Sequence, residues 1–250
     1  MFNLRAAAKE FSPAWFKVLY AKKIAPKDSL RGVLGRFKQE PKLIFDIGAN
    51  IGGVSQIFLE TFPSANICAF EPCQNTFKDL KKNLASENSR VQFYPFGFAA
   101  EAGSANLNIT SSHGANSILA VNEDYQKCNP GISEVNSEPI SLRQMDEFVA
   151  SEKITKIDLV KIDVEGFEAE VLKGGRSTFT NIVSTVIMEL SFCRHGFDSP
   201  NWLQLLNTMH EFGFDLITVF DLHHTDIEKV GYRLVQMDAV FVRSGSVLLH

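Results

Sequence analysis

Leu43-Ile-Phe-Asp-Ile-Gly-Ala-Asn-Ile-Gly-Gly53 is the stretch that decides the fold of this chain. Its apolar start, Leu43 to Phe45, predicts a buried strand, and Asp46 lies at the carboxyl end of that strand. Val54 to Phe62 is predicted to form a helix whose N-terminus faces a ligand. The glycines between them remove Cβ atoms that would block the close approach of that ligand: Gly48, Gly52 and Gly53. A strand, a glycine loop and a helix in this order indicate a site for a nucleotide-like molecule.

Strands and helices alternate through most of the chain. The pattern predicts strands at residues 43–48, 66–71, 91–98, 157–164, 184–190, 215–220 and 238–243. It predicts helices at residues 53–62, 74–85, 141–151, 167–173 (closed by Gly174-Gly175) and 202–212, and a loop region at 110–137. The expected α/β fold is a Rossmann-like, doubly wound, seven-stranded and mostly parallel sheet with helices on both faces, whose last strand runs antiparallel beside its predecessor. Ligands bind such sheets outside the carboxyl ends of the strands, where four acids fall: Asp46, Glu71, Asp163 and Glu189.

The bulk properties fit one domain. A length of 250 residues with 45% hydrophobic content allows a sizeable core. No run approaches the roughly 18 apolar residues of a membrane-spanning helix. The four cysteines form no C-x-x-C pair, so we expect a cytoplasmic protein with reduced thiols and no structural zinc.

The first 42 residues differ in charge from the rest. They hold ten Lys and Arg against three Asp and Glu, whereas residues 43–250 hold fifteen against twenty-six. Ala6 to Tyr20 is predicted to form an amphipathic basic helix with aromatic side chains. We therefore divide the chain into a basic helical extension, residues 1–42, and a main domain, residues 43–250. The extension packs on the domain as a lid, serves as a dimer element, or lies on an anionic membrane surface.

The second predicted strand narrows the choice of ligand. The glycine loop lacks the G-x-G-x-x-G spacing that dinucleotide enzymes use for pyrophosphate. Glu71 ends the strand at 66–71, where doubly wound folds place the acid that binds the ribose hydroxyls. The ligand expected from these features is a nucleoside with a zwitterionic tail and no phosphates, which matches S-adenosylmethionine better than NAD. The predicted cofactor is therefore S-adenosylmethionine.

Here the chain resembles the class I S-adenosylmethionine-dependent methyltransferases, because Asp46-Ile-Gly-Ala-Asn-Ile-Gly52 is similar to their first motif. The resemblance implies that the cofactor is held by Asp46, Gly48, Asn50, Gly52 and Glu71. The third predicted strand ends Phe96-Gly-Phe-Ala-Ala100, without the acid that many members aim at adenine. Backbone, Phe98 and Ala99 are therefore expected to hold the ring.

A second motif resembles one family within that class. Ile157-Asp-Leu-Val-Lys-Ile-Asp-Val-Glu-Gly-Phe-Glu-Ala-Glu-Val-Leu-Lys-Gly-Gly175 is similar to the K-I-D-V-E-G strand end and K-G-G helix end of FkbM-type methyltransferases. Gly114-Ala-Asn-Ser-Ile-Leu119 and Met145-Asp-Glu-Phe148 are also similar, so the resemblance covers about residues 43–190. It implies an O-methyltransferase that acts on a hydroxyl of a saccharide, glycan precursor or related metabolite.

The residues after the strand at 157–164 are candidates for the chemistry. Methyl transfer is an in-line displacement, so alignment supplies much of the acceleration and a base is needed only for a hydroxyl acceptor. Asp163, expected beside the cofactor's methyl group, or Glu165 would accept that proton. Lys161 shares a sheet face with Asp163 and would keep its carboxylate ionised, although a structural ion pair is the alternative.

The acceptor is expected between the 110–137 loop and the 192–200 loop. The candidate acceptor-binding residues are His113, Glu189 and His195, and the His223-His224 pair is a weaker alternative on a predicted loop. No metal is expected, although four acids offer an alternative Mg²⁺ site: Asp163, Glu165, Glu168 and Glu189. Nucleic acid is disfavoured as a partner because the main domain is acidic. A cofactor-binding protein without transfer activity and an NAD-dependent oxidoreductase remain open as other functions.

Overall fold

The computed structural model describes residues 28–227 and 231–246, so the predicted helix at Ala6–Tyr20 lies outside the described residues. Seven strands form the main sheet in the order β3-β2-β1-β7-β8-β10-β9. Their bounds are β1 Leu43–Ile47, β2 Asn66–Phe70, β3 Val91–Tyr94, β7 Ile157–Ile162, β8 Val183–Ser191, β9 Phe214–Ile227 and β10 Gly231–Arg243. The first five are parallel, and β10 is antiparallel to both of its neighbours, β8 and β9. The predicted seven-stranded, mostly parallel sheet is confirmed.

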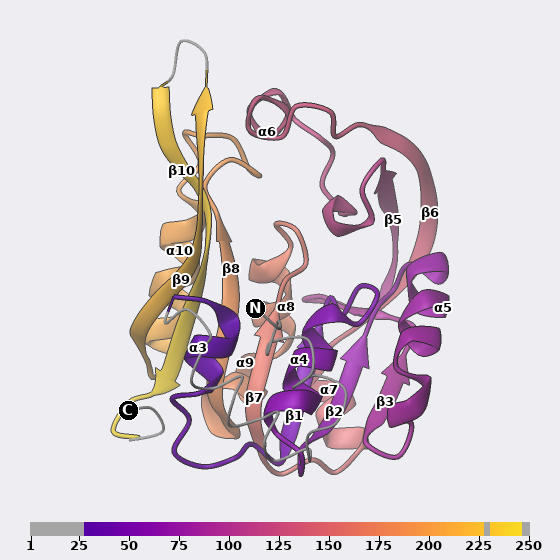
Figure 1. Ribbon diagram of the computed structural model, residues 1–250, viewed down its shortest axis with the longest axis vertical. Helices are drawn as coiled ribbons and strands as arrows, with labels where there is room; N and C mark the ends of the chain where they lie inside the picture. Colours follow the sequence, from indigo (N-terminus) through magenta and orange to yellow (C-terminus); the bar gives the residue numbers. More distant parts are fainter. Residues whose placement is uncertain (1–27, 228–230, 247–250) are drawn as a thin grey trace, which may run out of the picture.

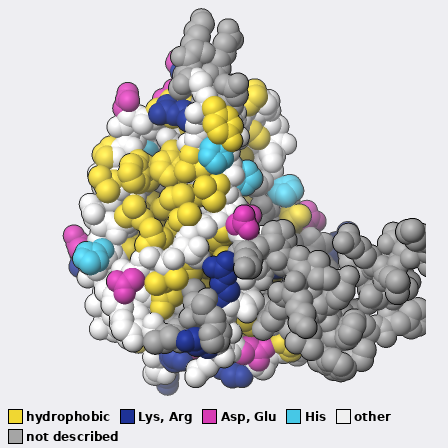
Figure 2. All heavy atoms as spheres, turned by 60° about the vertical axis from the view of Figure 1, so that its left-hand side comes forward, with side chains coloured by type: hydrophobic (Ala, Val, Ile, Leu, Met, Phe, Trp, Pro, Cys, Tyr) yellow, Lys and Arg dark blue, Asp and Glu magenta, His cyan; other side chains and the backbone are white. Residues whose placement is uncertain are grey.

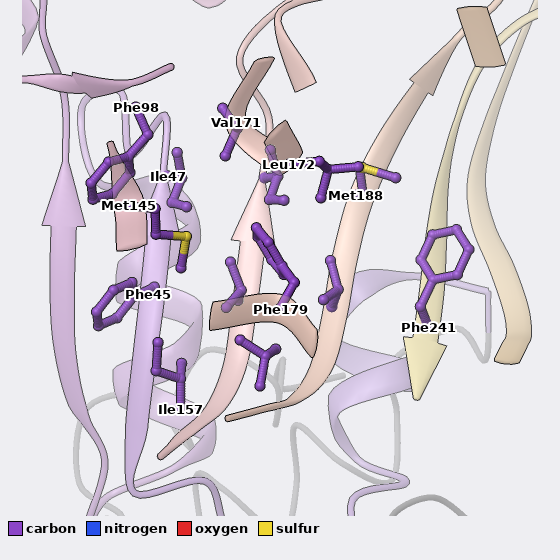
Figure 3. Packing of buried hydrophobic residues seen from close by; sticks show 14 of the residues in the cluster. Phe45, Ile47, Phe98, Met145, Ile157, Val171, Leu172, Phe179, Met188 and Phe241 are labelled. Atoms are coloured by element: carbon purple, nitrogen blue, oxygen red, sulfur yellow. The ribbon is translucent and has the colours of Figure 1, made fainter. Parts of the chain in front are cut away.

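Helices cover both faces of this sheet and bury its apolar side chains. On one face lie α3 (Leu30–Leu34), α4 (Gly53–Thr61) and α5 (Gln74–Asn83), which share one core cluster with the strands. On the other face lie α7 (Met145–Ser151), α8 (Glu168–Gly174), α9 (Arg176–Asn181) and α10 (Asn201–Glu211). Figure 3 shows the apolar side chains of this second cluster between the strands and these helices. Because both faces are covered, the central parallel strands are mostly apolar, and the charged side chains of Asp46 and Lys161 in β1 and β7 are buried.

A second, three-stranded sheet was not predicted. It has the order β4-β6-β5 and consists of β4 (Gly97–Phe98), β5 (Gly103–Thr110) and β6 (Glu134–Arg143). The single strand predicted at residues 91–98 is therefore wrong, because β3 ends at Tyr94 and Pro95, which has no N–H to donate, separates it from β4. The helix predicted at residues 141–151 is wrong over its first residues, which belong to β6.

The region predicted as a loop at residues 110–137 has structure of its own. It contains the 3₁₀ turn η2 (His113–Ala115), α6 (Glu123–Cys128) and the start of β6, while a further 3₁₀ turn, η1 (Ala85–Glu87), follows α5. Figure 1 shows α6 at the top, above the carboxyl ends of the parallel strands, with β5 and β6 on one side and the ends of β9 and β10 on the other. The second sheet and α6 therefore overhang the edge where a ligand is expected.

The far edge of the main sheet carries an apolar surface. Exposed apolar side chains lie on β9 and on α10: Leu216, Ile217, Leu222 and Leu203. Figure 2 shows apolar side chains gathered on this side of the molecule. In the part of the chain that the structure describes, no helix has the length and apolar character to cross a membrane.

Candidate active site

A pocket lies at the carboxyl ends of β1, β2 and β7, beneath the second sheet. The main sheet contributes Gly48, Asn50, Glu71 and Asp163 to its lining. The opposite wall is apolar and comes largely from the second sheet and the segment after η2: Phe98, Leu107, Ile118, Ile140 and Leu142. None of the described residues that line this pocket is Lys or Arg. The pocket thus combines carboxylates with an apolar wall and, among these residues, offers no cationic side chain to a phosphate.

The glycine at the start of the loop is required by the packing of the chain itself. Gly48 has φ +80°, and a Cβ built on it would lie 1.8 Å from the backbone oxygen of Asp163. Its N–H donates to the Phe70 carbonyl at 3.0 Å, which fixes the loop against β2. The absence of a Cβ at Gly48 is therefore required by the chain's own packing, a reason that the sequence did not reveal. A Cβ on Gly53 would meet no atom within 4 Å.

Glu71 is held by the loop from β1. Its Oε2 accepts a hydrogen bond from the Asn50 N–H at 3.0 Å, and its Oε1 accepts one from the Cys73 N–H at 2.8 Å. Burial raises the pKa of the Glu71 carboxyl to about 7, although the two N–H groups oppose the shift. Each oxygen keeps lone-pair capacity for a further donor, such as a ligand hydroxyl. The strand-end acid therefore lies where the sequence predicted.

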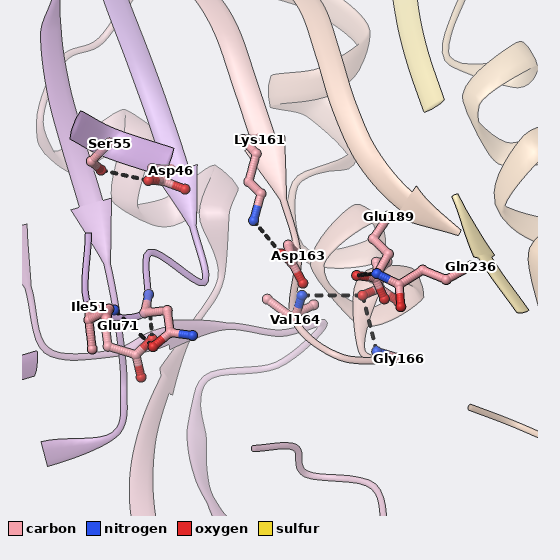
Figure 4. Close-up of polar contacts among 12 residues, drawn as sticks. Asp46, Ile51, Ser55, Glu71, Lys161, Asp163, Val164, Gly166, Glu189 and Gln236 are labelled. Atoms are coloured by element: carbon pink, nitrogen blue, oxygen red, sulfur yellow. Dashed lines mark hydrogen bonds and ion pairs between the residues drawn. The ribbon is translucent and has the colours of Figure 1, made fainter. Parts of the chain in front are cut away.

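Three residues predicted to contact the cofactor do not line the pocket: Asp46, Gly52 and Ala99. Asp46 lies within β1 and is fully buried behind the loop, where its Oδ2 accepts from the Ser55 hydroxyl at 2.5 Å (Figure 4). Burial raises the pKa of this carboxyl, and nearby Lys161 opposes the shift. Gly52 precedes α4 and faces Leu80 and Leu84 of the core. Asp46 thus supports the loop from behind.

Lys161 and Asp163 form an ion pair at the end of β7. The Lys161 Nζ lies 2.5 Å from Asp163 Oδ2 (Figure 4). The lysine side chain is 7% exposed and the aspartate side chain 32% exposed, so only the carboxylate reaches the pocket. Burial lowers the pKa of Lys161, but the Asp163 and Asp46 carboxylates outweigh it and the net shift is upward. The predicted shared face is confirmed, and the lysine provides a fixed positive charge behind Asp163.

Three carboxyl groups gather beside the pocket. One oxygen from each of Asp163, Glu165 and Glu189 lies within 4.8 Å of the others. Burial, followed by repulsion from Asp163, raises the pKa of Glu165 to about 8 and that of Glu189 well above its ordinary value. Glu189 accepts a hydrogen bond from Gln236 Nε2 at 2.6 Å (Figure 4). The Glu165 and Glu189 carboxyl groups therefore retain protons near neutral pH.

Glu168, the fourth acid of the alternative metal site, has a different place. Its Oε1 accepts hydrogen bonds from the Gly166 N–H at 3.1 Å and the Val164 N–H at 3.2 Å. The Glu168 side chain therefore closes the turn after β7 and is not part of the cluster formed by Asp163, Glu165 and Glu189. Glu189 does not line the pocket and lies deeper, on the β8 side of Asp163 and Glu165.

The predicted histidines separate into two groups. His113 lines the pocket, and its Nδ1 lies 2.9 Å from the Asn50 Oδ1. The His195 Nε2 lies 2.8 Å from the Gly166 carbonyl oxygen, so this ring holds the turn after β7 from outside the pocket. The prediction that His223 and His224 lie on a loop is wrong. Both lie within β9, because the strand continues to Ile227.

The loops expected on either side of an acceptor are in contact with each other. Asn122 Nδ2 donates to the Arg194 carbonyl at 2.6 Å, and the Phe197 N–H donates to Asp124 Oδ2 at 3.1 Å. The segment around α6 is thus joined to the loop after β8.

A family model described as the methyltransferase FkbM domain matches residues 46–216. The chain belongs to the FkbM methyltransferase family. The matched segment includes the glycine loop, the second sheet and the turn after β7, which together build the pocket.

Three curated proteins are similar in sequence to part of this chain. Hexuronic acid methyltransferase AglP of Haloferax volcanii is 30% identical over 68% of this chain and 63% of its own length. Methyltransferase 1 of Beauveria bassiana is 26% identical over 60% of this chain and 65% of its own. 2-O-methyltransferase NoeI of Sinorhizobium fredii is 24% identical over 60% of this chain and 64% of its own. The matches therefore span less than two thirds of each relative.

Among solved structures, the fibrillarin pre-rRNA processing protein of Methanococcus jannaschii is 13% identical and has a TM-score of 0.49. The superposition covers 89% of this chain and 77% of that chain.

Several residues of the FkbM site escaped sequence reasoning. Leu107, Ile140 and Leu142 line the pocket from β5 and β6, and their two-residue spacing with apolar neighbours was a signal for these strands. Ser117 and Arg194 hold the turn after β7 from distant segments, through hydrogen bonds to the Glu165 carbonyl. No local pattern points to such contacts.

Proposed function

We propose that this protein is an S-adenosylmethionine-dependent O-methyltransferase that acts on a hydroxyl of a saccharide, glycan precursor or related metabolite. The observation that carries the proposal is the lining of the pocket. Glu71 and Asp163 face an apolar wall, and none of the described lining residues is cationic. A nucleoside with a positively charged tail fits this combination, whereas the pyrophosphate of NAD would be repelled by the carboxylates and would lack the G-x-G-x-x-G loop whose backbone N–H groups bind it.

The residues present fit the cofactor in kind. The Glu71 carboxylate would accept hydrogen bonds from the ribose hydroxyls while it holds the Asn50 and Cys73 amides. The apolar wall around Phe98 and Ile140 would cover the adenine ring. When bound, S-adenosylmethionine supplies a methyl group on a positive sulfur. The Asp163 carboxylate would lower the energy of that positive charge.

The charge of the site favours a hydroxyl acceptor over a carboxylate. The Asp163 carboxylate would repel an anion beside it, and Glu165 and Glu189, whose oxygens lie within 4.8 Å, carry no positive charge that would offset this repulsion. A hydroxyl also needs a base, and Asp163 is suited to it because it reaches the pocket and has Lys161 behind it. The names of AglP and NoeI, a hexuronic acid methyltransferase and a 2-O-methyltransferase, support a saccharide as acceptor. We favour a hydroxyl of the sugar over its carboxyl group.

The test has two parts. Titration calorimetry of the full chain with S-adenosylmethionine, S-adenosylhomocysteine and NADH should show binding of the first two alone. Transfer of a labelled methyl group would then be measured with neutral hexosides, hexuronic acids and their reduced alcohols. Transfer to the neutral sugars and to the alcohols supports the proposal. NADH binding would contradict the cofactor, methyl ester formation would contradict the hydroxyl, and cofactor binding without transfer would support the non-catalytic alternative.

A further inference from the structure

Arg194 lies in the loop after β8 and is almost wholly buried, with 1% of its surface exposed. Its Nε donates to the Glu165 carbonyl at 3.0 Å, and its Nη2 donates to the Leu119 carbonyl at 3.0 Å. Its guanidinium lies 4.2 Å from the centre of the Tyr125 ring. One side chain therefore joins three segments that are far apart in sequence: the turn after β7, the segment that leads to α6, and the loop after β8.

The turn that Arg194 holds has an unfavourable backbone. Glu165 has φ +55° and Gly166 has φ +98°, both in the left-handed region. A left-handed conformation is costly for a residue with a Cβ and persists where surrounding contacts impose it. Here the Glu165 carbonyl accepts from the Ser117 hydroxyl at 2.7 Å as well as from Arg194. External donors thus fix the turn that carries Glu165.

The Arg194 side chain packs closely against this turn, at the glycine that follows Glu165. A Cβ on Gly166 would lie 2.6 Å from the Arg194 Cγ and 2.7 Å from the Leu119 Cδ1. The backbone of Arg194 also contacts the segment that leads to α6, because its carbonyl accepts a hydrogen bond from Asn122 Nδ2 at 2.6 Å. Among the described residues no carboxylate forms a salt bridge with Arg194, and its guanidinium donates to two backbone carbonyls. Its position suits holding chain segments in place more than neutralising an acid.

We propose that Arg194 is a positioning residue for methyl transfer, which holds the Glu165 turn and the segment around α6 in the one arrangement that places the acceptor against Asp163. The inference rests on the proposed function. A planar guanidinium reaches two carbonyls in fixed directions while it stacks on a ring, which an ammonium group does not do. Arg194→Lys should therefore fail to restore the function even though it keeps the charge.

The experiment compares Arg194→Lys and Arg194→Met with Arg243→Lys in the full chain. Arg243 is a matched control: it donates to the Val183 and Phe212 carbonyls and lies 4.2 Å from the Phe214 ring, at the opposite end of the sheet from the site. Three quantities would be measured for each variant: S-adenosylhomocysteine affinity, amide exchange at residues 115–125 and 163–168, and kcat and KM for the acceptor found above.

We expect both Arg194 variants to lower kcat by about 10- to 100-fold, the loss that a misplacement of about 1 Å produces. Amide exchange at residues 115–125 and 163–168 should rise, while S-adenosylhomocysteine affinity stays within about twofold. Arg243→Lys should lower the thermal midpoint and leave kcat per folded molecule unchanged. If the Arg194 variants do the same, or if lysine restores kcat, the positioning role is wrong.

A milder variant keeps the test decisive if the Arg194 variants do not fold. Ser117→Ala removes the second donor to the Glu165 carbonyl and should change exchange and kcat in the same direction by less. Unchanged exchange at residues 163–168 in Ser117→Ala would contradict the inference. If the wild-type chain transfers no methyl group at all, the proposed function fails. The exchange pattern would then still decide whether Arg194 holds the turn.

Discussion

The two sides of the pocket are built in different ways. On the proposed cofactor side, hydrogen bonds join the loop after β1 to the end of the adjacent strand β2, from the Asn50 N–H to Glu71 and from the Gly48 N–H to Phe70. On the acceptor side, the Glu165 turn is held by Ser117 and Arg194, which come from separate loops. The first side is built from the ends of two adjacent strands of the main sheet, whereas the second depends on loops that lie outside that sheet. Variants on the two sides should therefore affect different steps: cofactor binding on one and transfer on the other.

The largest effect should come from removing the base. Asp163→Asn is expected to lower kcat by about 10²- to 10⁴-fold, because the acceptor hydroxyl loses the group that takes its proton. S-adenosylhomocysteine affinity should change by only a few fold. Initial rates and calorimetry would measure both, with exposed Asp79→Asn as the control. Unchanged turnover with intact cofactor binding would remove Asp163 from the mechanism.

The next effect lies on the cofactor side. Glu71→Gln should weaken S-adenosylhomocysteine binding by about 10- to 100-fold, the range for a lost hydrogen bond to a charged group. In the wild type, the pKa of Glu71 is about 7, so the ionised form that ribose needs increases as pH rises. Affinity should rise about tenfold from pH 6 to pH 8 and level off above that. Glu101→Gln, at an exposed position, is the control. A flat affinity profile in the wild type would contradict the ribose role.

A smaller effect concerns the stability of the cofactor-free protein. Burial raises the pKa of Glu71, Glu168 and Asp238 to about 7. Because these values lie above the ordinary ones, the folded protein keeps protons that the unfolded chain loses. The free energy of unfolding should therefore fall as pH rises from about 4.5 through 7.

Thermal unfolding at pH 5.5 and pH 8 would measure this change. The midpoint should be lower at pH 8 by about 2–4 °C or more, the shift for about 1 kcal/mol in a domain of this size. Asp238→Asn should reduce the difference. A midpoint that rises between these two pH values would show that the buried acids are ionised in the folded state at little cost.

The smallest effect should follow metal removal. The Lys161 Nζ already lies 2.5 Å from the Asp163 carboxylate. The positive charge of this lysine would repel a metal ion bound to the cluster of Asp163, Glu165 and Glu189. Dialysis against EDTA should leave the transfer rate unchanged. Loss of activity that Mg²⁺ restores would instead make the three carboxyl groups a metal site.

The cofactor side could be predicted because its signals are local. Apolar strands with acids at their ends and a glycine loop appear as short patterns, and the main sheet follows from their alternation. Asp46 shows the limit of such patterns. Its position in β1 was predicted, but whether its side chain faces a ligand or Ser55 depends on the packing behind the loop.

The acceptor side could be predicted only in part. β5 and β6 are largely exposed and rich in polar residues, so their alternation is weak, and β4 has only two residues. The turn after β7 carries the K-I-D-V-E-G motif, but the residues that hold it are 48 residues away for Ser117 and 29 residues away for Arg194. No periodicity links such positions. Their roles follow from the three-dimensional contacts.

The most direct test of the account is a crystal structure of the full chain with S-adenosylhomocysteine. We predict that the ribose hydroxyls bind the Glu71 carboxylate, that the adenine lies against the wall formed by Phe98 and Ile140, and that the sulfur faces Asp163. An empty pocket at saturating ligand, or a nucleoside bound with its ribose away from Glu71, would contradict the account.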